Sequence, residues 1–414
     1  MRSDLTDDPR PYDVVVVGAS GFTGRLVVEY LAEKYPVGAP VRWAVAGRNR
    51  QKLEKVIDER CRSGDKPTIV VADSHDSSAL RQLAGDTRVV LTTVGPYAKY
   101  GSELVAACVE SGTHYCDLAG EAQWIRRMID KHQAGAIESG AKIVNSCGFD
   151  SIPSDIGVFY LQQQAMETYG EPCEEIILLV KAMKGGASGG TFASMLNAVE
   201  EARSDRAVAR ILGDPYSLNP EGDRQGPDGR DQNGTRYCSA AGVWTAPFVM
   251  AAINTRIVRR SNALLNYAYG REFRYCEATS TGRGPGGWLK SALMTAGLAS
   301  FMVACTFNFT RSTIVRKMVP APGQGPTREQ RENGFFDLRL FGRMKDGNLL
   351  QAKVTGDRDP GYGSTSKMLS ESAVCLALDG LDGTGGFLTP ASAMGQPLLD
   401  RLTANAGLSF EMVS

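Results

Sequence analysis

The chain has 414 residues, more than one hydrophobic core usually serves, so two domains or one domain with a large insertion are expected. Lys plus Arg and Asp plus Glu each number 46, and this zero net charge gives no sign of a nucleic-acid-binding protein. Nine scattered cysteines without a C-x-x-C pair, and only three histidines, indicate neither a metal site nor a disulfide framework. Acidic residues near the N-terminus replace the apolar core of a signal peptide, so a cytoplasmic protein is expected.

Short apolar, β-branched segments alternate with helical patterns over residues 1–150. This alternation is typical of an α/β fold with a doubly wound parallel sheet covered by helices on both faces. Strands are expected at 13–17, 42–46, 68–72, 89–94 and 142–145, and helices at 24–35, 51–61, 101–111 and 122–139.

After residue 150 the elements become longer and Gly-rich breaks become frequent. We therefore expect a second domain over 151–360 and a C-terminal helical segment over 361–414. The expected elements are a strand at 174–182, a turn at 184–190, a helix at 191–212, a long mobile loop at 213–236, a strand at 267–279, a hairpin at 335–355, and helices at 364–378 and 391–402.

An apolar segment covers residues 288–310, of which 291–310 carry no charge. Its length would suit a membrane span, but its Ser, Thr and Asn residues weaken that interpretation. A buried or interfacial helix is the preferred expectation. If the segment is exposed, it is a membrane-docking or acyl-binding surface.

A glycine-rich turn follows the first expected strand and opens an amphipathic helix. A dinucleotide site needs small residues there, because the backbone turns sharply, approaches the pyrophosphate and aims helix N–H groups at it. The alternative is a tight strand–helix turn without a ligand. The predicted cofactor-binding residues of this turn are Gly18, Ala19, Ser20, Gly21, Phe22, Thr23 and Gly24.

The second strand ends in Gly47-Arg48, and no acidic residue occurs at this strand end. An NAD site usually places an Asp or Glu there to bind the ribose 2′-hydroxyl. Arg48 would instead pair with a 2′-phosphate, so NADP(H) is the predicted cofactor. The alternative is that Arg48 is a solvated charge beside a helix cap.

Two more strand ends contribute predicted cofactor contacts. Asp73 closes the third strand, where side chains commonly face the adenine, and Ser74 follows it. The fourth strand leads into Gly95, Pro96 and Tyr97, where the nicotinamide half should lie. Tyr97 would pack on the cofactor or touch substrate; alternatively it is an aromatic residue that only covers the crevice.

Seven motifs occur along the chain: GASGFTG at 18–24, GRNRQKL at 47–53, VGPY at 94–97, GTHYCDLAGE at 112–121, GFDSIPSD at 148–155, GGTFA at 189–193 and GGFLTPASAMG at 385–395. Together they resemble the saccharopine dehydrogenase-like oxidoreductase family, in the branch that includes the trans-acting enoyl reductases. The resemblance implies a Rossmann domain, a second α/β domain with a mixed sheet inserted before the C-terminal segment, and a C-terminal segment that packs back on the Rossmann domain. It also implies NADPH-dependent reduction, with lipid-linked enoyl thioesters as substrates.

The run from His114 to Glu121 is expected to form a loop near the cofactor and supplies the candidate catalytic residues. Hydride transfer to an enoyl thioester leaves an enolate, which needs a hydrogen bond at the thioester oxygen. Tyr115 could donate that bond, and Asp117 or Glu121 could orient it. The alternative is that these acids only cap the next helix or hold the loop.

The leading functional hypothesis is an NADPH-dependent oxidoreductase that reduces an apolar, lipid- or polyketide-linked substrate. One alternative is an amino-acid C–N dehydrogenase of the saccharopine type. Another is a lipid-associated binding protein that retains the Rossmann domain. The expected partners are a small-molecule or acyl substrate and, through 288–310, a peripheral lipid surface.

Overall fold

The computed structural model describes residues 9–37, 40–61, 66–149, 151–185, 189–306 and 325–413. The chain divides into two compact units. The first unit comprises residues 1–119, 127–149 and 362–406, and the second comprises 120–126, 150–361 and 407–414.

The first unit is built on a seven-stranded sheet, sheet A, with the spatial order β13-β6-β5-β4-β1-β2-β3. Every neighbouring pair of strands is parallel. The central strand β1 reads YDVVVV, and Val14, Val15 and Val16 have no exposed surface, as expected for a strand covered on both faces. The strands are β1 Tyr12–Val17, β2 Trp43–Gly47, β3 Thr68–Val71, β4 Thr87–Thr92, β5 His114–Cys116, β6 Lys142–Val144 and β13 Gly386–Leu388.

Helix α15 brings the C-terminal part of the chain back to sheet A, where it packs against β1, β4 and β5. Its buried Glu371 accepts hydrogen bonds from Tyr30 at 2.6 Å and Tyr35 at 2.8 Å. Arg401 lies 3.5 Å from the same carboxylate, so one buried acid joins α1, α15 and α16. The helices are α1 Phe22–Lys34, α2 Arg50–Arg60, α3 Ser77–Gly85, α4 Tyr97–Tyr100, α5 Ser102–Glu110, α6 Ala122–Ser139, α15 Thr365–Leu378 and α16 Pro390–Asn405.

The second unit is built on a mixed seven-stranded sheet, sheet B, with the order β14-β12-β11-β7-β10-β9-β8. Strands β7 and β10 are parallel, and the other neighbouring pairs are antiparallel. The strands are β7 Glu175–Lys184, β8 Arg236–Cys238, β9 Val243–Pro247, β10 Arg274–Gly282, β11 Phe335–Arg343, β12 Leu349–Gly356 and β14 Leu408–Met412.

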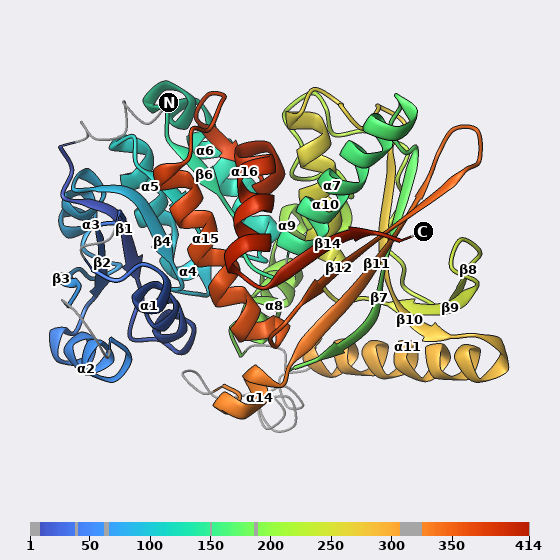
Figure 1. The fold of residues 1–414 in the computed structure, drawn as a ribbon, viewed down its shortest axis with the longest axis horizontal. Coiled ribbons are helices and arrows are strands. Elements are labelled where there is room, and N and C mark those ends of the chain that lie inside the picture. The colour runs from blue at the N-terminus through green and yellow to red at the C-terminus, as the bar shows by residue number, and fades with distance from the viewer. Residues whose placement is uncertain are drawn as a thin grey trace. The chain divides into compact units, whose positions relative to one another are not determined.

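Helices cover sheet B at several places. Helix α7 packs closely on β11 and β12, where a Cβ added at Gly157 would lie 3.2 Å from Val354 and 3.4 Å from Leu340. Helix α11 lies along β9 and β10 (Figure 1). The helices are α7 Ile152–Tyr169, α8 Gly189–Ser204, α9 Arg206–Gly213, α10 Ala251–Leu264, α11 Gly284–Thr306 and α14 Arg328–Glu332, with a π-helical turn at Pro360–Ser364.

The predicted fold class is confirmed, since a doubly wound parallel sheet is combined with an inserted unit built on a mixed sheet. The predicted hairpin and C-terminal helices are also confirmed. Three local predictions are wrong. His114–Cys116 forms β5 instead of a loop, the strand expected from 267 begins only at Arg274, and the helix expected over 191–212 is interrupted by Asp205, which caps α9.

Two predicted segments need further comment. The segment from 214 to 235 contains neither helix nor strand, as predicted, but Tyr216 and Leu218 within it are buried. Of the Gly-rich turn at 184–190, residues 186–188 lie outside the described part of the chain.

The observed units differ in detail from the domain ranges expected from the sequence. Residues 120–126, expected in the first domain, belong to the second unit. Strand β14 pairs with β12 of sheet B, so the last residues extend the second unit rather than the C-terminal helical segment. Residues 362–406 belong to the first unit.

Candidate dinucleotide-binding site

The glycine-rich turn lies where the strand order of sheet A reverses. From β1 the chain builds outward through β2 and β3, and then starts again from β4 on the other side of β1. The turn after β1 contacts the end of β4, because Thr93 Oγ1 donates to the Gly18 carbonyl at 3.3 Å. In open α/β sheets such a switch point is the usual position of a bound ligand.

Two glycines of the turn are required by its geometry. Gly18 has a φ of +84°, and a Cβ there would lie 2.6 Å from Val94 Cγ2. A Cβ at Gly24 would lie 2.2 Å from the Gly18 carbonyl oxygen, so the helix approaches the strand too closely for any side chain. Gly21 is the N-cap of α1; no side chain caps this end, and the first turn contains no acidic residue. This arrangement fits a phosphate at the helix N-terminus.

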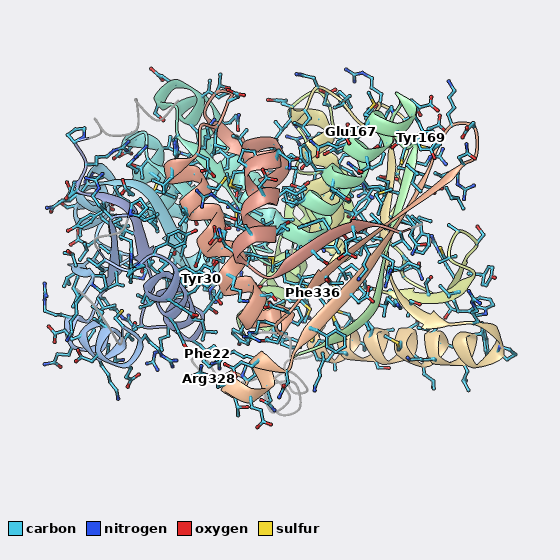
Figure 2. All side chains as sticks on the ribbon, in the orientation of Figure 1. Phe22, Tyr30, Glu167, Tyr169, Arg328 and Phe336 are labelled. Atoms are coloured by element: carbon cyan, nitrogen blue, oxygen red, sulfur yellow. The ribbon has the colours of Figure 1, made fainter. Side chains whose placement is uncertain are left out.

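The remaining turn residues have distinct surroundings. Ala19 is fully buried, whereas Ser20 and Thr23 are half-buried. The Ser20 carbonyl accepts a hydrogen bond from Arg25 Nε at 3.1 Å. The Phe22 ring packs edge-on against Tyr362, with 4.7 Å between ring centroids, and thus fixes the start of α1 (Figure 2).

Arg48 directly follows β2 and is exposed. Asn49 caps α2 by accepting a hydrogen bond from the Lys52 N–H at 2.9 Å, and no acid occurs in the first turn of α2. Within the described residues, Arg48 makes no ion pair or hydrogen bond through its side chain. A guanidinium held at this strand end is therefore available for an anionic group of a ligand.

Asp73 and Ser74 follow β3 and form the turn into α3. The Asp73 carboxylate accepts a hydrogen bond from the His75 N–H at 3.0 Å, and Asp76 caps α3. Both Asp73 and Ser74 are half-buried. Asp73 thus shapes the turn, and its contact with an adenine remains a prediction.

Gly95, Pro96 and Tyr97 follow β4, with a cis peptide bond between the first two. Gly95 is exposed and Pro96 half-buried, whereas the Tyr97 side chain is buried. The Tyr97 hydroxyl donates to the Thr92 carbonyl at 3.2 Å and accepts from the Leu118 N–H at 3.1 Å. These bonds let Tyr97 join the ends of β4 and β5, and its contact with cofactor or substrate remains a prediction.

Tyr115 and Asp117 are both completely buried at the end of β5. The Tyr115 hydroxyl donates to Asp117 Oδ2 at 2.9 Å, and the side-chain amide of Asn145 donates to the same oxygen at 2.8 Å. The N–H groups of Ala119 and Ser146 donate to Asp117 Oδ1 at 2.9 and 3.0 Å. Asp117 therefore fastens the ends of β5 and β6 to each other, which favours its loop-holding role; a catalytic role remains a prediction.

Burial raises the pKa of Asp117 to about 6, although the hydrogen bonds it accepts counteract that rise. Burial, together with the neighbouring Asp117 charge, also raises the pKa of Tyr115 well above its usual value. Glu121 belongs to the second unit, where it accepts a hydrogen bond from Ser194 at 2.8 Å.

Sequence reasoning missed some residues that organise this edge of sheet A. Asn145 and Ser146 complete the Asp117 site, and Thr365 Oγ1 accepts a hydrogen bond from the Phe149 N–H at 3.0 Å. A Cβ at Gly148 would lie 2.6 Å from Leu118 Cδ2. The Asn-Ser pair directly after β6 is a sequence signal for polar contacts at this strand end. Thr365 gives no such signal, because it lies more than 200 residues from Phe149 along the chain.

The second unit has its own buried polar cluster around Glu277 of β10. Its carboxylate accepts hydrogen bonds from Tyr275 at 2.6 Å and Asn254 at 2.9 Å, and Ser151 donates to Asn254 at 3.1 Å. Burial raises the pKa of Glu277 to about 7. Asp150, which precedes Ser151, lies outside the described residues. The described residues contain no group of three or more His, Cys, Asp or Glu side chains that could hold a metal ion.

The strand order and the glycine turn define a Rossmann-type dinucleotide-binding protein. The saccharopine dehydrogenase NADP binding domain, as a sequence family, matches residues 14–144 of the chain. That range includes the glycine turn, Arg48 and the ends of β3 and β4.

Relatives that are similar over almost the whole chain define its family more narrowly. A candidate trans-acting enoyl reductase of Mycobacterium tuberculosis is 42% identical over 418 residues, covering 98% of this chain and 99% of its own. The trans-acting enoyl reductases of Mycobacterium leprae and Mycobacterium ulcerans are 37% and 39% identical, each covering 96% of this chain and 97% of its own. This chain therefore belongs to the trans-acting enoyl reductase branch of the saccharopine dehydrogenase-like oxidoreductases, as its motifs predicted.

A solved structure shares the fold. Apo saccharopine dehydrogenase (L-Glu forming) of Saccharomyces cerevisiae has a TM-score of 0.52 and 12% sequence identity, covering 97% of this chain and 99% of its own. At that identity the likeness concerns the fold alone.

Proposed function

We propose that the protein is a cytoplasmic NADPH-dependent oxidoreductase that reduces the enoyl group of an apolar, lipid- or polyketide-linked substrate. The observation that carries the cofactor half is Arg48, an exposed guanidinium at the end of β2 without an ion-pair partner among the described residues. The match of residues 14–144 to an NADP-binding domain supports the same conclusion.

The residues of the first unit fit NADP(H) at three strand ends. The turn from Gly18 to Gly24 would hold the pyrophosphate, and Arg48 would hold the 2′-phosphate. Asp73 and Ser74 would border the adenine, and the backbone at Gly95 would border the nicotinamide half. When bound, the cofactor supplies the hydride.

The substrate half of the proposal rests on two observations. The relatives with 37–42% identity are named as enoyl reductases. In addition, α11 exposes apolar side chains over most of its length, which suits a protein that meets an apolar substrate or surface. We propose an enoyl group rather than an amino-acid imine as the group reduced, because the relatives are named as enoyl reductases.

Calorimetric binding of NADPH and NADH to the wild type and to Arg48→Asp tests the cofactor half. A charge-assisted contact is worth about 1.5–3 kcal/mol, so the preference for NADPH should fall by roughly 10- to 150-fold in the variant. Arg81→Asp, at an exposed position on α3, makes the same charge change and should leave the preference unaltered. A wild type that binds no NADPH, or an unchanged preference in Arg48→Asp, contradicts the proposal.

Consumption of NADPH tests the substrate half. It should occur with long-chain enoyl thioesters and not with saccharopine or lysine-derived imines. The opposite pattern would favour the alternative of an amino-acid C–N dehydrogenase. Tight NADPH binding without turnover of either class would favour a lipid-associated binding protein.

A further inference from the structure

Helix α11 of the second unit is the one described helix that is long and apolar enough to cross a membrane by length and composition. Its 23 residues span about 34 Å. An 18-residue window within Gly284–Cys305 has a mean hydropathy of 1.4, yet only 11% of that window is buried. The helix is as predicted from residue 291 to 306, but most of it is exposed rather than buried; residues 307–310 lie outside the described chain.

Helix α11 lacks the polar outer side that a helix packed on a soluble domain normally has. Its inner side places Ser291 against β9, where this fully buried hydroxyl donates to the Thr245 carbonyl at 2.7 Å. Its outer side presents large apolar residues to the surroundings, although helices normally turn such residues inward. The most exposed of these residues, with their exposed fractions, are Leu293 66%, Val303 57%, Leu289 54% and Trp288 49%.

The charged residues that lie near α11 in the sequence have one sign. Lys290 is the only charged residue of α11, and Arg283 immediately precedes the helix. In the sequence no Asp or Glu occurs between Glu277 and Glu329, whereas six Lys or Arg residues do. An apolar face with purely basic flanks is complementary to a surface that is apolar inside and anionic outside.

We propose that α11 docks on an anionic phospholipid bilayer, lying in the plane of the membrane. Leu289, Leu293 and Val303 enter the boundary between headgroups and acyl chains, and Lys290 and Arg283 contact lipid phosphates. This inference rests on the proposed function only for the apolar nature of the substrate, which such docking would bring within reach.

Two other occupants fit this face less well. A spanning helix must be surrounded by lipid or by other spanning elements, but α11 packs along one side on β9 and β10 of sheet B. A second copy of the chain would bring the same basic, acid-free segment against itself, so like charges would face one another.

Flotation with lipid vesicles tests docking directly. The wild type should float with vesicles of phosphatidylglycerol and phosphatidylcholine, and much less with phosphatidylcholine alone. The double variant Leu293→Glu/Val303→Glu should lose at least about tenfold in partitioning, since two apolar anchors become charged. Lys290→Glu should lose about fivefold or more on the anionic vesicles.

The matched control is Leu349→Glu, which changes a leucine of similar exposure on the β11–β12 hairpin. It should float like the wild type. Leu298 and Phe301 are less suitable test positions because both are only half-exposed, and Phe301 packs edge-on against Phe192 with 5.9 Å between ring centroids.

Four outcomes would overturn the inference: no flotation of the wild type, flotation that does not depend on anionic lipid, unchanged flotation of the double variant, or attachment that resists alkaline extraction as a spanning helix does. A dimer in light scattering that the double variant dissociates, without vesicle binding, would assign the face to a second copy. NADPH binding by the same variants keeps the two proposals separable, because flotation needs no cofactor and cofactor binding needs no lipid.

Discussion

Tyr115→Phe removes a single oxygen atom and separates two roles of this residue. The Tyr115 hydroxyl is buried and donates to Asp117 at 2.9 Å. If Tyr115 holds the loop, its loss should lower the stability of the protein with little effect on turnover. If it stabilises an enolate, its loss should lower turnover with little effect on stability.

The size of the stability effect depends on the protonation of Asp117. A hydrogen bond to a charged group contributes about 1.5–3 kcal/mol and one to a neutral group about 0.5–1.5 kcal/mol. Because the pKa of Asp117 is raised from 3.8 to about 6, its carboxylate is ionised at pH 8 and mostly neutral at pH 5. The variant should therefore lose about 1 kcal/mol more at pH 8 than at pH 5.

The sign of the pH dependence follows from the raised pKa. The neutral carboxyl of Asp117 favours the folded state fully below pH 3.8, and this contribution is lost as the pH rises through 6. In the wild type the group accounts for a fall of about 3 kcal/mol in the free energy of unfolding between those limits. Removing the Tyr115 hydroxyl raises the pKa of Asp117 further, so the fall should be larger and extend to higher pH in the variant.

Urea unfolding from pH 4 to 8, together with NADPH oxidation, measures both quantities. Tyr30→Phe is the matched control, since it removes another buried hydroxyl that donates to a carboxylate of the same unit. Unchanged stability of Tyr115→Phe at pH 8 with a hundredfold loss of kcat would refute the loop-holding interpretation.

Two further variants test other parts of the structure. Gly24→Ala forces a Cβ against the Gly18 carbonyl and should cost about 1–3 kcal/mol and abolish NADPH binding by calorimetry, whereas Gly85→Ala, where a Cβ meets nothing within 4 Å, should be neutral. Ionisation of Glu277 should lower the free energy of unfolding of the wild type by up to about 3 kcal/mol as the pH rises from 4.5 through 7, and Glu277→Gln should remove this fall. The unfolding midpoint measured against pH in both proteins tests this, and equal slopes would contradict it.

The parts of the fold that the sequence predicts well are those determined by neighbouring residues. The apolar run of β1, followed by Gly18 and Gly24, specifies a buried strand, a sharp turn and a helix start. The hairpin of β11 and β12 is equally local, since its turn contains Gly347 at a φ of +90°.

Features that depend on distant residues could not be read from the pattern. Strand β5 is only three residues long, and its pairing with β4 and β6 decides its conformation. The face of α11 that meets sheet B could not be identified either, because its inner and outer residues are nearly equally apolar.

The candidate site divides in the same way. The positions of Gly18 and Arg48 could be predicted because each residue directly follows a strand, Gly18 after β1 and Arg48 after β2. The hydroxyls of Tyr97 and Tyr115 are of a suitable type for chemistry, but only the folded structure reveals that both are bonded to neighbouring strand ends.

The contribution of α15 to sheet A has a consequence for biosynthesis. Tyr30 and Glu371, which are hydrogen-bonded in the first unit, are separated by 341 residues along the chain. Strand β13, at the edge of the same sheet, is also made late. A ribosome adds roughly 5–20 residues per second, so the early strands must wait many seconds for the helix that covers them. During translation the nascent Rossmann sheet leaves an apolar face open, and we expect it to need a chaperone until residue 406 has emerged.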